Sequence, residues 1–227
     1  MIFEHFLIIK RMFPLDEPVE TMIIEEIHPD IHCNWMIGQG RYARMGVLGD
    51  GSCFFHSVCA ITNRNNYLLQ NEENQKKIAY EFRCDFGKVF SKEQYDLLSA
   101  KSRSPKTFQK EKDGFCSPKV WADEVMIRFA SKVLGINLIF LDLKNKKAYC
   151  GVHQDETIDA VLDNEKIMQS TGIVAWVNHM HFEPIVRIDD AEKGIITTLF
   201  EPSKSKEDEE AVRSFMKFYN KQCKINT

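Results

Sequence analysis

The sequence predicts a mixed α/β (α+β) fold, in which helices flank a central, mostly antiparallel β-sheet. Two segments, residues 65–90 and the stretch after Pro118, space their apolar residues as helices do, and residues 136–143 and 173–177 are apolar runs typical of buried strands. With 227 residues, the chain is long enough to form one large domain. A domain of this size buries about 70% of its unfolded surface, so no disulfide or metal is needed to hold it together.

A long helix is expected within residues 65–90. Ile78, Phe82 and Phe86 recur there at i, i+4 and i+8, which places them on one face of a helix. Polar residues dominate the following stretch, and we expect residues 101–113 to form a loop.

A second helix is expected to begin at Ser117 and Pro118, because serine is a favoured N-cap and proline fits the first helical position. Gly135 is expected to end it. The apolar face would place four side chains in the core: Trp121, Val125, Phe129 and Val133.

Strands are expected at residues 136–143, as the central buried strand, and at residues 173–177 and 182–188. The last two are joined by a short polar corner that carries His179 and His181. In an extended chain these two histidines would face the same side.

Cys53 is the strongest candidate for a nucleophile. It follows a tight Asp50-Gly51 turn and begins an apolar run with helical spacing, so it is expected at a helix N-terminus. The unpaired N–H groups and the positive dipole end there favour a thiolate, which would lower the thiol pKa from about 8.5 toward neutrality. The backbone N–H groups of Asp50, Gly51 and Cys53 are the candidates for an oxyanion hole.

A cysteine nucleophile needs a base, and His179 and His181 at the polar corner are the main candidates. His56 lies one helical turn after Cys53, where a packed or solvent-exposed polar role is expected. His28, His32 and Cys33 superficially look like metal ligands, but no second paired cluster at zinc spacing accompanies them, and neither a metal nor another cofactor is expected.

Three blocks together resemble the ovarian-tumour (OTU) family of cysteine proteases. The blocks are Asp50-Gly51-Ser52-Cys53-Phe54-Phe55, Trp121-Ala122-Asp123-Glu124 and His181-Phe182-Glu183-Pro184, and the resemblance covers roughly residues 47–188. It implies a papain-like OTU fold and a thiol-dependent deubiquitinase that cuts isopeptide bonds after the C-terminal Gly-Gly of ubiquitin. The implied partners are ubiquitin or polyubiquitin chains, with ubiquitin-like modifiers as an alternative.

Carried over to this chain, the resemblance makes Cys53 the nucleophile and His181, which is followed by an aromatic residue, the general base. Family members often place Asp or Asn two positions after that histidine, whereas this chain has Glu183. Asp50 is the other candidate for orienting the imidazole, and Asn178 is a third. The choice between them stays open at this point.

The resemblance also suggests three regions. Residues 1–45 would be an N-terminal extension packed on or preceding the catalytic domain, and residues 46–200 the OTU-like catalytic domain. Residues 201–227 would form a charged linker followed by an amphipathic helix. Within these limits, residues 195–200 are expected to add a strand, residues 202–210 to be the linker, and residues 211–219 the helix.

The composition and the apolar start of the chain limit the kinds of partner and compartment that are expected. The formal net charge of -3 makes no electrostatic case for a nucleic-acid partner. Seven cysteines, an odd number without regular spacing, argue against a disulfide framework, and Cys59, Cys84 and Cys150 are expected in the core. The apolar start at residues 2–9 is too short to span a bilayer, so we expect a soluble protein of the cytoplasm, or of the host cytoplasm for a viral or bacterial effector.

The same residues leave rival functions open. These are a papain-like peptidase acting on another protein or modifier, a deamidase or transferase with the same thiolate chemistry, and a catalytically inactive ubiquitin-binding module. The presence of both the Cys53 and the His181 blocks favours an enzyme over the inactive module.

Overall fold

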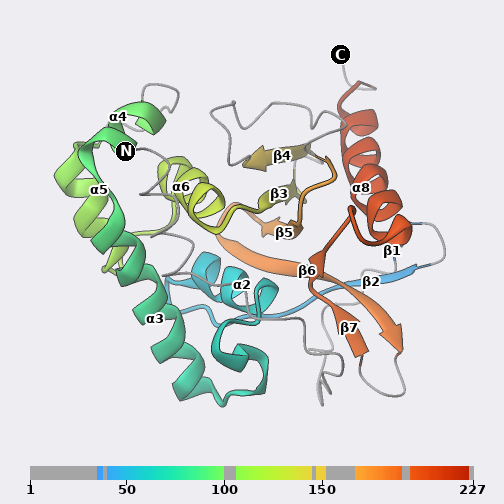
Figure 1. Cartoon of the computed structure of the whole chain (residues 1–227), viewed down its shortest axis with the longest axis horizontal. Coiled ribbons are helices and arrows are strands. Elements are labelled where there is room, and N and C mark those ends of the chain that lie inside the picture. Colours follow the sequence, from blue (N-terminus) through green and yellow to red (C-terminus); the bar gives the residue numbers. More distant parts are fainter. Residues whose placement is uncertain are drawn as a thin grey trace.

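The computed structural model describes residues 35–37, 40–99, 106–144, 147–151, 167–190 and 195–224. They form three layers, with a β-sheet between one group of helices and a single helix on the opposite face (Figure 1). The group of helices carries the candidate nucleophile, so its packing against the sheet determines where Cys53 lies.

The sheet has the order β1-β2-β6-β5-β3-β4, with β7 paired to β6 and β8 to β5. Only the β3–β5 pair is parallel among the strand pairs of the described residues. The predicted α/β fold with a mostly antiparallel sheet is therefore confirmed. The strands are β1 Trp35–Ile37, β2 Gly40–Arg44, β3 Asn137–Asp142, β4 Lys147–Gly151, β5 Thr171–Val177, β6 His181–Asp190, β7 Ile195–Thr197 and β8 Leu199–Phe200.

Strand β3 is buried along its whole length, as predicted, but it lies next to β4 at one end of the sheet rather than at its centre. Successive side chains of a strand point to opposite faces, and β3 supplies both cores in this way. Leu138 and Phe140 pack with the helices around Cys53, whereas Ile139 and Leu141 pack on the other face of the sheet.

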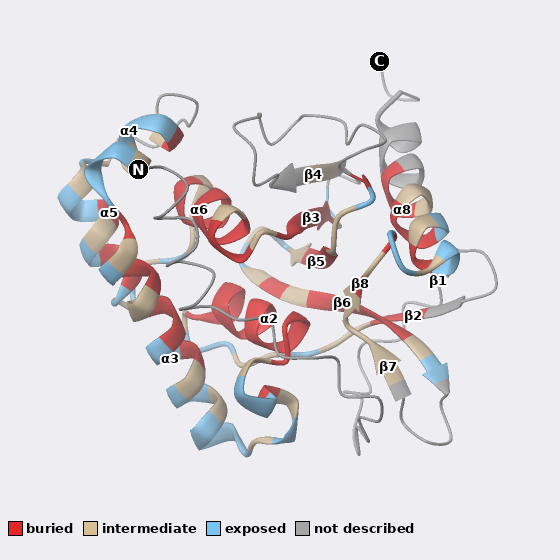
Figure 2. Cartoon of the chain, viewed as in Figure 1, coloured by how far each residue is buried: buried red, intermediate tan, exposed pale blue. Residues whose placement is uncertain are grey.

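Helices cover both faces, and their core-facing sides are buried (Figure 2). Helix α2 packs on β6, and α3 packs on α2. The helices are α2 Cys53–Ile61, the 3-10 helix η2 Arg64–Leu69, α3 Glu72–Val89, α4 Lys92–Ser99, α5 Phe108–Phe115, α6 Glu124–Leu134 and α8 Lys206–Lys224.

The predicted helix at residues 65–90 is interrupted at its start. Asn63, Asn65 and Asn66 have positive φ angles, which a continuing α-helix does not allow, so α3 begins only after the N-cap Asn71. The rest of the expected helix is confirmed, with Phe82 and Phe86 in the core.

Helix α6 begins six residues later than predicted. Its N-cap is Asp123, whose carboxylate accepts the N–H groups of Val125 and Met126, and Ser117 instead belongs to a turn. Trp121 therefore precedes the helix and is 57% exposed, so its predicted place in the core is wrong. The predicted end at Gly135 is confirmed, with a φ of 67°.

Two predicted irregular segments contain helix instead. Helix α5 begins at Phe108, inside the expected loop at residues 101–113. Helix α8 begins at Lys206, inside the expected linker at residues 202–210, and it buries Val212 and Phe215 against the sheet. The predicted strand at residues 195–200 corresponds to β7 and β8.

Two cysteines form a pair that the sequence analysis did not predict. Cys84 of α3 is joined to Cys116, which follows α5, by a disulfide. Cys84 was expected as a core residue and not as a disulfide partner, while Cys59 lies in the core as expected. The side chain of Cys150 lies outside those described, and the cellular compartment stays a prediction.

None of the helices in the described part of the chain combines the length and the apolar character that crossing a membrane requires.

Candidate active site

Cys53 is the first residue of α2, as its sequence context predicts. The bend before it depends on Gly51, which has a φ of 87°. A Cβ atom at Gly51 would lie 2.0 Å from the carbonyl oxygen of Pro118, so only glycine fits there. Asp50 stabilises the same bend, because its Oδ1 accepts the Ser52 N–H at 2.9 Å.

Cys53 lines a cleft between the start of α2 and the turn that joins β5 to β6. Trp121 and Ala122 come from the segment before α6, and His179 and Met180 from the β5–β6 turn. Trp121 and Met180 are strongly exposed, at 57% and 61%. The remaining walls are Gly51, Phe54, Phe55, Trp176 and Phe182.

The Cys53 thiol is nearly buried, and this changes its acidity. Burial raises the thiol pKa above its usual value, while hydrogen bonds from the backbone N–H groups of Phe182 and Phe54 offset part of the rise. The pKa lowering predicted from the helix N-terminus is therefore wrong for this form of the protein. A neutral thiol at pH 7 requires a base to remove its proton.

Helix α2 is attached to the start of β6 beside that thiol. The Ser57 hydroxyl lies 3.0 Å from the Phe182 carbonyl oxygen and 2.8 Å from the Cys53 carbonyl oxygen. Phe182 also packs its ring against Phe54. Cys53 thus lies directly against the strand that begins at His181.

His181 and Glu183 form a pair at the start of β6. Their side chains point to the same face of the strand, and His181 Nε2 lies 3.8 Å from Glu183 Oε1. Glu183 is held from the other side by Arg44 of β2, whose guanidinium nitrogen lies 3.3 Å from Oε2. Glu183 therefore lies within ion-pair distance of both the His181 imidazole and the Arg44 guanidinium.

His179 does not share the extended conformation of His181. Asn178 and His179 have φ angles of 51° and 60°, and the Met180 N–H closes the turn on the Val177 carbonyl oxygen. The prediction that both histidines face one side of an extended strand is wrong, since two left-handed residues lie in the turn between the strands. Asn178 serves as the first of these two turn residues.

The ring of His179 is fixed within the cleft wall. Its Nε2 lies 2.9 and 3.0 Å from the two carboxylate oxygens of Asp142, the last residue of β3. The ring also lies 4.5 Å from the Trp176 ring, centroid to centroid. His179 and Asp142 thus make a second histidine–carboxylate pair near Cys53.

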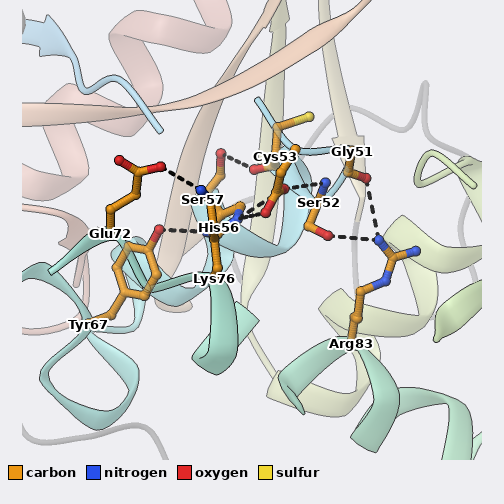
Figure 3. A network of polar contacts seen from close by, with 10 residues as sticks. Gly51, Ser52, Cys53, His56, Ser57, Tyr67, Glu72, Lys76 and Arg83 are labelled. Carbon is orange, nitrogen blue, oxygen red and sulfur yellow. Dashed lines mark hydrogen bonds and ion pairs between the residues drawn. The ribbon is translucent and has the colours of Figure 1, made fainter. Parts of the chain in front are cut away.

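Asp50 orients a third histidine, His56. Nε2 of His56 lies 3.1 Å from both Asp50 oxygens, and Nδ1 lies 2.7 Å from the Tyr67 hydroxyl (Figure 3). Because a carboxylate only accepts, Nε2–H donates to Asp50, and the neutral ring accepts from Tyr67 at Nδ1. Figure 3 shows the Cys53 sulfur pointing away from the Tyr67 side of this network.

The network explains the acidities of its members. Burial lowers the pKa of His56, against the opposing effect of Asp50. Burial would raise the pKa of Asp50, but hydrogen bonds from His56 and from the Ser52 N–H outweigh it, and the pKa is lowered. The packed polar role predicted for His56 is confirmed.

Sequence reasoning missed two residues of this region. Asp142 follows a buried apolar run, and an acidic residue at such a strand end was a signal for a buried partner. Tyr67 carried no comparable signal. The candidate metal ligands His28, His32 and Cys33 lie outside the described residues.

Comparison with known proteins shows a likeness in structure. No protein-family model matches the sequence, and a search of curated proteins finds no relative. A solved ovarian tumor (OTU) domain in complex with ubiquitin superimposes with a TM-score of 0.51 at 12% identity, covering 83% of this chain and 90% of that chain. The OTU domain of OTUD1 superimposes with a TM-score of 0.43 at 13% identity, covering 63% and 85% of the two chains.

The first of these likenesses shows that the chain has an OTU-like fold. At 12% identity the likeness concerns the fold alone.

Proposed function

We propose that the protein is a cysteine-dependent deubiquitinase that hydrolyses the isopeptide bond after the C-terminal Gly-Gly of ubiquitin. The observation that carries this proposal is the position of Cys53. It is the first residue of α2, it lines a cleft, and its sulfur receives the backbone N–H of Phe182, the neighbour of His181.

The proposed reaction begins with transfer of the Cys53 thiol proton to His181. The sulfur attacks the carbonyl carbon of the terminal glycine, and the protonated imidazole then gives its proton to the leaving lysine amine as the C–N bond breaks. A water molecule then loses a proton to the same histidine and attacks the thioester carbonyl carbon, the C–S bond breaks, and the imidazolium returns the proton to the Cys53 sulfur. One imidazole thus performs each of these proton transfers in turn.

His181 is the proposed base because it directly precedes Phe182, whose N–H contacts the Cys53 sulfur. Glu183, at 3.8 Å, is the proposed orienting group, since an acceptor behind the imidazole steadies its charged form. The backbone N–H groups at the start of α2, including that of Cys53, are the proposed donors to the oxyanion, together with those of Asp50 and Gly51. We assign Asp50 to the bend and to His56.

Two observations support ubiquitin as the substrate. The OTU domain that superimposes on 83% of this chain was solved in complex with ubiquitin. In addition, the exposed side chains of Trp121 and Met180 border the cleft and offer apolar surface to an incoming peptide tail. The C-terminal tail of ubiquitin is such a segment.

A ubiquitin probe with an electrophilic C-terminus tests the proposal. We expect the folded wild-type protein to form a covalent adduct with the probe. The variants Cys53→Ala and Cys59→Ala are the matched pair of controls. Cys59 is a free, buried cysteine of the same helix, so Cys59→Ala is expected to keep labelling and Cys53→Ala to lose it.

The rival functions give different results. Failure of the folded wild-type protein to react with the probe would overturn the proposal. Reaction only with probes of ubiquitin-like modifiers would point to another modifier as the substrate. Binding of ubiquitin without an adduct would indicate an inactive binding module.

A further inference from the structure

Arg83 of α3 is a fully buried arginine that contacts the bend before Cys53. Its exposed fraction is 0%. Its Nη1 lies 2.9 Å from the Ser52 hydroxyl oxygen and 3.4 Å from the Gly51 carbonyl oxygen. Ser52 and Gly51 are the two residues immediately before Cys53, and Figure 3 shows Arg83 reaching both from below.

The other N–H groups of Arg83 bind the end of α5 and the segment that follows it. Nη2 lies 2.9, 2.6 and 3.0 Å from the carbonyl oxygens of Gly114, Ser117 and Val120, which share its two N–H groups, and Nε donates to that of Phe115. One guanidinium group therefore joins the Cys53 bend to residues 114–120. Such a set of acceptors suits the flat, multiply donating fork of arginine and not the single ammonium of lysine.

The two segments that Arg83 joins are in contact at Gly51. The carbonyl oxygen of Pro118 occupies the space in which a Gly51 side chain would lie. Residues 121 and 122, which follow the same segment, form a wall of the Cys53 cleft. Arg83 thus connects the bend that presents the nucleophile to the segment that leads into the wall formed by residues 121 and 122.

The positive charge of Arg83 also affects the ionisable groups near the Cys53 bend. Burial lowers the pKa of Arg83 to about 10, so the side chain keeps its proton at neutral pH. Its positive charge interacts favourably with a carboxylate at Asp50 and with a thiolate at Cys53.

We propose that Arg83 is a positioning residue for Cys53, which holds the Gly51–Ser52 bend against residues 114–120 so that the first N–H groups of α2 face the reacting carbonyl. The expected decrease in kcat rests on the proposed deubiquitinase function. The contacts themselves do not depend on the substrate.

The test compares Arg83→Met and Arg83→Lys with Arg128→Met. Arg128 is a matched control because it is also buried, at 3% exposed, and its described ion pair is to Glu124 in α6, away from the Cys53 bend. All variants are assayed well below their unfolding temperatures with a fluorogenic amide of the ubiquitin C-terminus. A second assay measures alkylation of Cys53 by iodoacetamide, which requires no ubiquitin.

For Arg83→Met we expect kcat to fall about 10- to 100-fold with KM within about twofold, as for the loss of transition-state positioning. We also expect Cys53 alkylation at pH 8 to slow about fivefold, because a nearby positive charge is lost. Arg83→Lys keeps the charge but not the fork, so its alkylation is expected near the wild-type rate while kcat stays low. Arg128→Met is expected to change neither quantity.

Equal kcat and alkylation values for Arg83→Met and Arg128→Met would overturn the inference, even if both variants are destabilised. If Arg83→Met does not fold, Ser52→Ala takes its place, since it removes only the 2.9 Å contact. That variant is expected to lower kcat about threefold or more, and an unchanged kcat would count against the role. A wild-type protein that does not cleave ubiquitin substrates contradicts the proposed function, whereas the alkylation comparison still decides the role of Arg83.

Discussion

The carboxylate of Asp142 holds His179 through both of its oxygens, at 2.9 and 3.0 Å from Nε2. This contact is tighter than that between Glu183 and His181, where Oε1 and Nε2 are 3.8 Å apart. Two candidate bases, His179 and His181, are therefore each paired with a carboxylate near Cys53.

Replacing each histidine separately distinguishes the two pairs. Because His181 precedes the residue whose N–H contacts the Cys53 sulfur, we expect His181→Ala to lower kcat by about 10³-fold or more. His179→Ala is expected to lower kcat by less than about tenfold, since His179 serves as a wall of the cleft. The measurement is kcat on a ubiquitin C-terminal amide, and a larger loss for His179→Ala would reverse the assignment.

Glu183 is expected to act through His181. Glu183→Gln keeps the size of the side chain but removes the charge that steadies the imidazolium, so kcat should fall about 10- to 100-fold with little change in KM. Asp142→Asn is the matched comparison, because it removes the charge behind His179 instead. Equal losses in steady-state kinetics for the two variants would contradict a special role for Glu183.

Trp121 and Met180 are expected to contribute to substrate binding rather than to stability. Both are more than half exposed at the edge of the cleft, so Trp121→Ala and Met180→Ala should each raise KM about five- to tenfold. Their unfolding temperatures should change little. Leu69→Ala is the control, since Leu69 is 59% exposed but is not among the residues that line the cleft. If Leu69→Ala raised KM as much as Trp121→Ala and Met180→Ala do, this interpretation would be refuted.

Stability is expected to depend on pH through His56. The folded-state pKa of His56 is lowered from 6.5, so the unfolded chain binds a proton on this residue at a higher pH than the folded chain does. The free energy of unfolding should therefore decrease as the pH falls through 6.5. Asp50, whose folded pKa is lowered, adds stability that is lost only below its usual value of 3.8.

Urea unfolding of wild type and His56→Gln at pH 7.5 and 5.5 measures the His56 contribution. The decrease between the two pH values should be smaller in the variant, because glutamine does not titrate. A decrease of the same size in both proteins would show that other groups cause it.

Local sequence patterns predicted the helix start at Cys53, the strands around residues 173 and 182, and the buried strand that became β3. These predictions succeeded because turn chemistry and apolar spacing act over a few residues. The errors arose where a distant group intervened. Ser117 and Pro118 have the composition of a helix start, but the Ser117 and Val120 carbonyl oxygens bind the buried Arg83, and α6 begins at Glu124 instead, after the N-cap Asp123.

The pKa of Cys53 likewise depends on both a local effect and the tertiary packing. A helix N-terminus by itself favours the thiolate, and the sequence establishes that Cys53 occupies one. Packing of α2 against β6 buries the thiol, however, and that desolvation outweighs the local effect.

The sequence alone thus determined the class of fold, the nucleophile candidate and the small set of histidines from which its base must come, because each depends on local residue types and spacing. Only the tertiary structure decided which carboxylate each histidine binds. Asp50 binds His56 six positions away, Asp142 binds His179 across 37, and Glu183 lies two positions from His181. Such pairings depend on strand register and on turn geometry, which bring distant side chains within a few ångströms. Local residue types and spacing do not determine which partners meet.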